Sequence, residues 1–213
     1  MATKKKKRKK KKKTNYVLII IIALVMVIIV TFVYIFRDKI SEKIKDYGPS
    51  VFMTTDYEEY VLKYAKQDNI DPRFVFAIIN TESHFNPKVT SDVGARGLMQ
   101  IMEDAYNWIK FRMNDEREHT FDDMYDPELN IEYGTFLLSY LYEKFDNSYE
   151  LTAAAYHGGM NAVEGWIENG TVDPKNFNLD DVPSNVTANY IYKVMKAYNK
   201  YKEKLEDDLN YEE

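Results

Sequence analysis

Residues 16–36 constrain this chain more than any other feature, because they are 21 consecutive residues without a charged side chain. A helix of that length, rising about 1.5 Å per residue, matches the roughly 30 Å apolar core of a bilayer. A buried helix of this composition would carry some polar positions. A signal peptide would have a shorter apolar part followed by small residues, whereas here Arg37, Asp38 and Lys39 follow. The pattern predicts one uncleaved transmembrane helix.

The charges that flank this segment predict its orientation. Ten basic residues occupy positions 4–13, and positively charged flanks of a membrane helix stay in the cytoplasm. We expect residues 1–15 to form a cytoplasmic tail that is attracted to anionic lipids of the bilayer, with residues 37–213 on the other side. The expected localisation is the cell membrane, single-pass, with the folded domain outside the cytoplasm.

A lysine run can also bind nucleic acid, but this one has no interleaved aromatic residues. The chain has 29 basic and 34 acidic residues, and the ten at positions 4–13 leave 19 basic residues against 34 acidic ones from residue 37 onward, a net charge of −15. Such a domain repels a phosphate backbone. We expect no nucleic-acid partner.

Cysteine and histidine content limits the chemistry. The absence of cysteine excludes a disulfide framework, a cysteine-ligated zinc site and a thiol nucleophile. The three histidines, His84, His119 and His157, share no metal-ligand spacing, so we expect no metal and no cofactor. A hydrophobic content of 45% supplies enough apolar surface for a core and excludes a disordered chain.

Helical spacing predicts an all-α, or mostly α, fold over residues 54–206, since strand signals are nearly absent. A stalk, residues 37–53, precedes this domain, and an acidic tail, residues 207–213, follows it. Start signals are a capping box at Thr55 and Glu58, aspartate followed by proline at residues 71–72 and 126–127, and Ser148. The expected helices cover about residues 55–69, 72–86, 98–113, 127–145, 149–156, 160–169 and 185–205.

Glu82 lies where the second expected helix should present a core residue. Phe74 and Ile78 precede it by eight and four positions and so share its face. Burial and the negative end of the helix dipole both favour the protonated carboxyl, which is the form a general acid needs. The alternative is a surface glutamate in the last turn of a helix.

Several short strings carry a resemblance to a known family. In order along residues 56–200 they are ESHFNP at 82–87, GARGLMQIM at 94–102, DPELNI at 126–131 with Gly134 and Leu138 after it, AAYHGG at 154–159 with Asn161, and Asn189-Tyr190. Together they resemble the soluble lytic transglycosylase family of peptidoglycan-cleaving enzymes.

The resemblance implies a lysozyme-like helical domain with Glu82 as the catalytic residue. In that family the acid protonates the glycosidic oxygen between N-acetylmuramic acid and N-acetylglucosamine. It then takes the proton from the muramoyl 6-hydroxyl, which closes on the anomeric carbon and leaves a 1,6-anhydro end. The implied partner is the glycan strand of peptidoglycan. A lysozyme-type hydrolase and an inactive glycan-binding scaffold are the alternatives, and protein partners stay open.

The resemblance also implies a set of substrate-binding residues. Each has a structural alternative, such as a helix C-terminal hydroxyl or a core side chain. These residues are Ser83, Gly97, Met99, Gln100, Tyr156, His157 and Tyr190.

Three positions depart from the family pattern. His157 stands where the family usually has asparagine, and it introduces a group that titrates near neutral pH. Glu103 replaces a common proline. Val186 and Thr187 stand where an acidic residue and a threonine are usual, which leaves the hydrogen bonding around Glu82 open.

Overall fold

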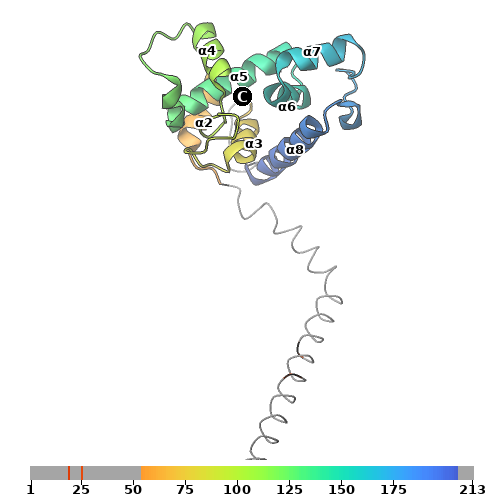
Figure 1. Ribbon diagram of the computed structural model, residues 1–213, viewed down its shortest axis with the longest axis horizontal. Coiled ribbons are helices and arrows are strands. Elements are labelled where there is room, and N and C mark those ends of the chain that lie inside the picture. The colour runs from red at the N-terminus through yellow and green to blue at the C-terminus, as the bar shows by residue number, and fades with distance from the viewer. Residues whose placement is uncertain (1–18, 20–24, 26–53, 206–213) are drawn as a thin grey trace, which may run out of the picture. The chain divides into compact units, whose positions relative to one another are not determined.

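The computed structural model describes residues 54–205 and the two single positions Ile19 and Val25 (Figure 1). Among these residues, none belongs to a helix that is long and apolar enough to cross a membrane. The predicted tail, transmembrane helix and stalk fall outside the described residues, apart from the two single positions, and so does the predicted acidic tail. Residues 54–205 belong to the second of two compact units, residues 52–213.

Residues 54–205 fold into helices joined by loops, which confirms the predicted mostly α class. No strand occurs in this range, and its extended pairing is limited to two isolated antiparallel bridges, Thr90 with Arg96 and Arg96 with Ile101. The helices are α2 (Glu58–Gln67), α3 (Pro72–Ser83), α4 (Glu103–Arg112), η2 (Phe121–Tyr125), α5 (Pro127–Lys144), α6 (Tyr149–Gly158), α7 (Met160–Glu168), η3 (Leu179–Asp181) and α8 (Asn185–Leu205).

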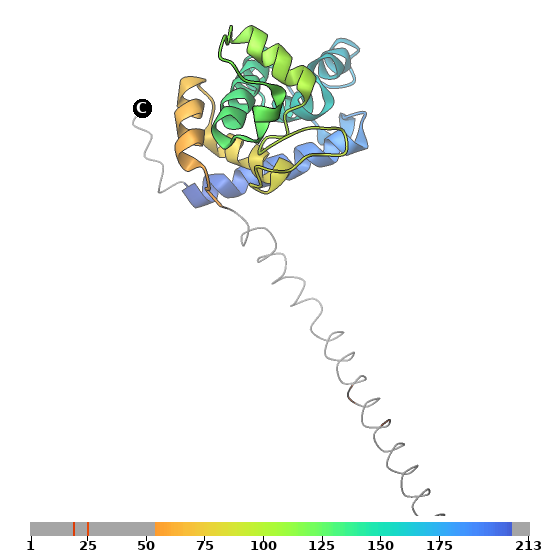
Figure 2. The same ribbon diagram turned by 60° about the vertical axis from the view of Figure 1, so that its left-hand side comes forward.

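Helix α3 is the central element of this domain. Six consecutive residues, 74–79, have no exposed surface, so the helix is enclosed on every side. It packs most extensively against α8, which also contacts α6, and Figures 1 and 2 show α8 running alongside both. Glu82 lies in the last turn of α3, where Tyr190 of α8 contacts it.

Three of the predicted helix starts are confirmed. Asp71 precedes Pro72 at the start of α3, and its carboxylate accepts a hydrogen bond from the backbone N–H of Arg73 at 2.9 Å. Asp126 caps α5 in the same way through Leu129 at 2.9 Å, and Ser148 caps α6. Such caps satisfy N–H groups that have no partner inside the helix.

Two local predictions are wrong. The capping box at Thr55 does not form, because Tyr57 adopts a left-handed conformation at φ 66° and α2 begins only at Glu58. The helix expected from residue 98 begins at Glu103 instead. Gly97 and Gln100 have φ values of 79° and 50°, which no right-handed helix contains, so residues 97–101 form a turn.

Candidate active site

Glu82 occupies the last turn of α3, at the edge of the core. Phe74 and Ile78, which share its helix face, are fully buried, as the spacing predicts. The chain turns away immediately afterwards, because His84 and Phe85 have left-handed φ values of 49° and 63°. Glu82 is therefore half-buried at the point where the core meets the surface.

Two opposing effects set the protonation of Glu82. Burial raises the pKa of its carboxyl from 4.5 to about 7, and a hydrogen bond from Tyr190 acts in the opposite direction. The Tyr190 hydroxyl donates to Oε1 of Glu82 at 2.6 Å. Burial also raises the pKa of Tyr190 well above 10, so the phenol keeps its proton. Near neutral pH, Glu82 is poised between its acid and its base form.

His157 lies against the other side of this pair. Its ring stacks on the ring of Tyr190 with centroids 4.5 Å apart and planes inclined by 28°. Its Nδ1 is 3.4 Å from the hydroxyl of Thr187, which is buried on α8. Partial burial lowers the pKa of His157 below 6.5, so the imidazole is neutral at pH 7.

Tyr156 connects α6 to the turn after Gly97. Its hydroxyl donates to the carbonyl of Met99 at 2.6 Å, and the backbone N–H of Met99 donates to Oδ1 of Asn130 at 2.8 Å. Met99 itself is fully buried, and its thioether lies against Gly134, where a Cβ atom would collide with it. Met99 is thus a core residue held through both of its backbone polar groups.

Gly97 and Gln100 shape the same turn. The left-handed φ of Gly97 favours glycine, and a Cβ there would collide with the carbonyl of Met124 and the amide of Asn130. The side-chain amide of Gln100 donates to the carbonyls of Gly97, at 2.9 Å, and Val89, at 3.2 Å. Gln100 therefore stabilises the turn from its surface side.

Ser83 takes the structural role that its position allows. It is buried, and its hydroxyl donates to the carbonyl of Ile79 at 3.2 Å, four residues earlier in α3. Val186, at the departure from the family pattern on α8, is 69% exposed and makes no contact with Glu82 that could replace a missing acidic residue. The hydrogen bond that Glu82 receives comes from Tyr190 instead.

Two residues of this site escaped the sequence reasoning as functional positions. Asn130 is fully buried on α5, where its amide donates to the carbonyls of Arg96 at 3.0 Å and Met124 at 2.8 Å besides accepting from Met99. Thr187 supports His157. An asparagine beside Ile131, at the start of a long apolar helix, was the available signal for Asn130, since a buried amide needs partners.

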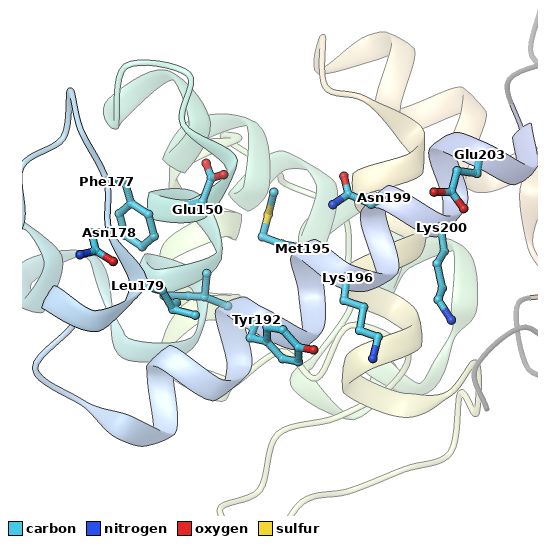
Figure 3. A pocket seen from close by; sticks show the side chains of 11 residues that line it. Glu150, Phe177, Asn178, Leu179, Tyr192, Met195, Lys196, Asn199, Lys200 and Glu203 are labelled. Carbon is cyan, nitrogen blue, oxygen red and sulfur yellow. The ribbon is translucent and has the colours of Figure 1, made fainter. Parts of the chain in front are cut away.

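Residues 54–205 contain no group of three or more histidine and acidic side chains arranged to hold a metal ion. A cavity of about 630 Å³ lies between α8, Glu150 of α6 and the segment Phe177–Leu179 (Figure 3). In Figure 3, Phe177 and Leu179 lie toward one end of the cavity, near Tyr192 of α8, and Asn199, Lys200 and Glu203 of α8 lie toward the other. None of the residues that the family resemblance singled out lines it, so this cavity is separate from the site around Glu82.

Comparisons with known proteins identify the family of this domain. Residues 59–178 match the family described as Transglycosylase SLT domain. A soluble lytic murein transglycosylase of Salmonella typhimurium is 36% identical over 149 residues, 68% of this chain. The structure of the 70 kDa soluble lytic transglycosylase from Escherichia coli matches with a TM-score of 0.67 and 32% identity over 73% of this chain. A complex of a 70 kDa soluble lytic transglycosylase with bulgecin A matches with a TM-score of 0.69 and 32% identity over 81% of this chain.

The chain matches only part of these proteins, namely 22% of the Salmonella protein and 25% and 28% of the two solved chains. The Salmonella and Escherichia coli proteins are both named soluble, which points against a single-pass membrane anchor. The localisation predicted from residues 16–36 is therefore wrong. That prediction rested on hydropathy and flanking charge alone, which describe only the length, polarity and surroundings of a segment.

Proposed function

The chain belongs to the transglycosylase SLT domain family, and we propose that it cleaves the glycan strands of peptidoglycan as a lytic transglycosylase. The observation that carries this proposal is Glu82, a half-buried carboxyl with a pKa of about 7 that accepts a hydrogen bond from Tyr190. A glycan-binding scaffold has no need for such a group, because burying an ionisable carboxyl costs free energy that a binding surface avoids. We place the catalytic domain at residues 54–206.

In the first step, protonated Glu82 gives its proton to the glycosidic oxygen between N-acetylmuramic acid and N-acetylglucosamine. The bond from that oxygen to the anomeric carbon of the muramoyl residue breaks, and its electron pair stays on the departing oxygen. Positive charge develops at the anomeric carbon and the ring oxygen. The substrate's own 2-acetamido group can stabilise this charge, so no second carboxylate of the protein is needed.

In the second step, the Glu82 carboxylate accepts the proton of the muramoyl 6-hydroxyl while that oxygen bonds to the anomeric carbon. The product carries a 1,6-anhydro ring, no water is consumed, and Glu82 ends the cycle protonated. One group must act as an acid and then as a base, and a pKa near 7 suits both tasks. Tyr190 stabilises the carboxylate formed between the two steps.

We assign the neighbouring residues to the glycan site. The Tyr156 hydroxyl donates to the carbonyl of Met99 in the turn, and the Tyr190 hydroxyl donates to Glu82. His157 is exposed beside the two tyrosines. Gly97, Met99 and Gln100 form the turn that Asn130 and Tyr156 hold in place. Ser83 lies next to the acid and supports the end of α3. We propose that these residues shape the site while Glu82 performs the proton transfers.

Mass spectrometry of the products separates this proposal from its two alternatives. Purified peptidoglycan is digested with the purified chain, and the muropeptides are weighed. A transglycosylase releases 1,6-anhydro ends, which are lighter by one water than the reducing ends that a hydrolase releases. Reducing ends alone would establish a lysozyme-type hydrolase. Glycan binding without any cleavage would establish the scaffold and end the enzymatic proposal.

A further inference from the structure

His157 differs from the asparagine usual in the family and contacts the residue that controls Glu82. It lies in the last turn of α6, and its ring covers one face of the Tyr190 ring at 4.5 Å. Thr187 donates its single hydroxyl proton to Ser184 at 3.1 Å, so we assign the proton of the neutral imidazole to Nδ1, facing the Thr187 oxygen at 3.4 Å. The ring therefore contacts Thr187 at one edge and Tyr190 on one face.

The position of the Tyr190 ring matters because, within residues 54–205, its hydroxyl donates the hydrogen bond that Glu82 accepts. A phenol hydroxyl moves with its ring, since the two are rigidly joined. A ring that is free to rotate about its side-chain torsions would hold a 2.6 Å hydrogen bond for less of the time. The stack with His157 limits that freedom on the side of α6.

We propose that His157 is a positioning residue. By stacking on Tyr190, it keeps the phenol hydroxyl within hydrogen-bond distance of Glu82 and thereby sets the pH at which the Glu82 carboxyl loses its proton. This rests on the proposed function, in which Glu82 is the acid. The stack and the hydrogen bond form one chain of contacts, from α6 through α8 to α3.

Few groups face the contacts that run from His157 through Tyr190 to Glu82. Glu82 is faced by Tyr190 from α8 and by Tyr156 from α6, both protonated at neutral pH because burial raises their pKa values well above 10. His157 is faced by Thr187 and Tyr190 of α8. Within residues 54–205, neither Glu82 nor His157 has an ion pair. The Tyr190 hydrogen bond is the contact that opposes the effect of burial on Glu82, so loosening it raises the pKa of Glu82.

Two substitutions separate the ring of His157 from its hydrogen bond. His157→Phe keeps a flat ring over Tyr190 and loses the contact with Thr187, whereas His157→Asn keeps a side-chain donor and loses the ring. We measure kcat/KM for glycan cleavage against pH with the purified chain and each variant. The basic limb should move upward by about half a pH unit in His157→Asn and stay in place in His157→Phe.

A second background tests whether the effect passes through Tyr190. Tyr190→Phe keeps the stack and removes the hydroxyl, so it should move the basic limb upward by itself. Adding His157→Asn to Tyr190→Phe should then move the limb no further. The control is His84→Asn, which removes another exposed histidine near Glu82 at a left-handed position that asparagine tolerates. It should leave the profile unchanged.

The proposal is overturned if His157→Asn leaves the basic limb in place, even where KM rises, because His157 then contacts only the sugar. A further upward shift in the Tyr190→Phe background overturns it as well. A purified chain that cleaves no glycan defeats the proposed function instead. In that case the titration of the Glu82 carboxyl, followed by carbon NMR in the same variants, still tests whether His157 acts on Glu82 through Tyr190.

Discussion

Glu82 and Asp115 both leave water when the chain folds, and their pKa values move in opposite directions. Burial dominates at Glu82, where one neutral phenol donates, and raises its pKa to about 7. At Asp115, the side-chain hydrogen bond from Arg117 is the largest effect and outweighs burial, so the pKa is lowered far below its usual range. The Asp115 side chain is only 5% exposed, so depth alone does not decide the outcome.

The number and charge of the donors explain the difference. Asp115 accepts from the guanidinium and backbone N–H of Arg117, from Nε2 of His119 at 3.0 Å and from the hydroxyl of Tyr133 at 2.9 Å. Each donor stabilises the carboxylate form. Together they anchor the loop between α4 and α5, and Glu132 on α5 binds the same guanidinium at 2.9 Å. A satisfied carboxylate stabilises a fold, whereas an under-satisfied one is available for proton transfer.

The largest effect expected from breaking this contrast is the loss of activity in Glu82→Gln. The amide fits the same space but cannot give a proton, so the rate of glycan cleavage should fall by about 10³-fold. The measurement is the rate of release of soluble muropeptides from purified peptidoglycan. Glu116→Gln, at an exposed position beside Asp115, is the matched control and should keep the parent's rate. A Glu82→Gln variant within tenfold of the parent would remove Glu82 from the mechanism.

The same variant should also change how stability depends on pH. The folded-state pKa of Glu82, about 7, lies above the ordinary value, so the folded state holds its proton longer and the parent loses stability as pH rises from about 4.5 to 7. Glu82→Gln removes this loss. Its free energy of unfolding should match the parent's at pH 4 and exceed it by about 3 kcal/mol at pH 8, measured by urea unfolding. Equal stabilities at pH 8 would contradict the raised pKa.

Asp115→Asn, in contrast to Glu82→Gln, should be less stable than the parent. It weakens the charge-assisted hydrogen bonds from Arg117 and His119, and we expect it to destabilise the fold by about 2 kcal/mol at pH 7. Because the folded-state pKa is lowered, the stabilisation is complete above the unfolded value of about 4 and is lost as pH falls below it. The deficit in urea unfolding should therefore narrow between pH 5 and pH 3.

The control for this variant is Asp146→Asn, at an exposed left-handed position, which should change stability by less than about 0.5 kcal/mol. At 25 °C, folded Asp115→Asn should cleave glycan at the parent's rate, because the hydrogen bonds of Asp115 and those of Glu82 and Tyr190 share no residue. A loss of activity without a loss of stability would mean that the two carboxylates are coupled.

The sequence pattern identified Glu82 as a candidate site residue but did not identify Asp115 as a buried carboxylate. Glu82 could be found because its spacing from Phe74 and Ile78 places it on an apolar helix face, and both neighbours are buried. Asp115 gave no such signal, since it lies in a run of charged residues that reads as a solvated loop. Its partner Tyr133 lies 18 residues further on, in α5, so only folding brings this donor to Asp115.

The same limit explains the remaining differences between prediction and structure. Helix starts marked by aspartate and proline could be predicted, because a cap is a local interaction. The turn at residues 97–101 could not, since Leu98, Ile101 and Met102 have helical spacing while long-range contacts from Asn130 and Tyr156 hold the backbone open. Tyr190 is 108 residues from Glu82, so no local pattern links the two.

The smallest effect is expected at Tyr156, which sharpens the comparison because it is a tyrosine of the same site with a different acceptor. Its hydroxyl donates to the Met99 carbonyl, whereas Tyr190 donates to the carboxyl of Glu82. Tyr156→Phe should cost about 1 kcal/mol of stability in urea unfolding, because the buried carbonyl loses its donor. The basic limb of the pH profile should stay in place. If Tyr156→Phe moved that limb as far as Tyr190→Phe does, general polarity of the site would set the pKa of Glu82. An unmoved limb assigns that control to the one hydroxyl that reaches the acid.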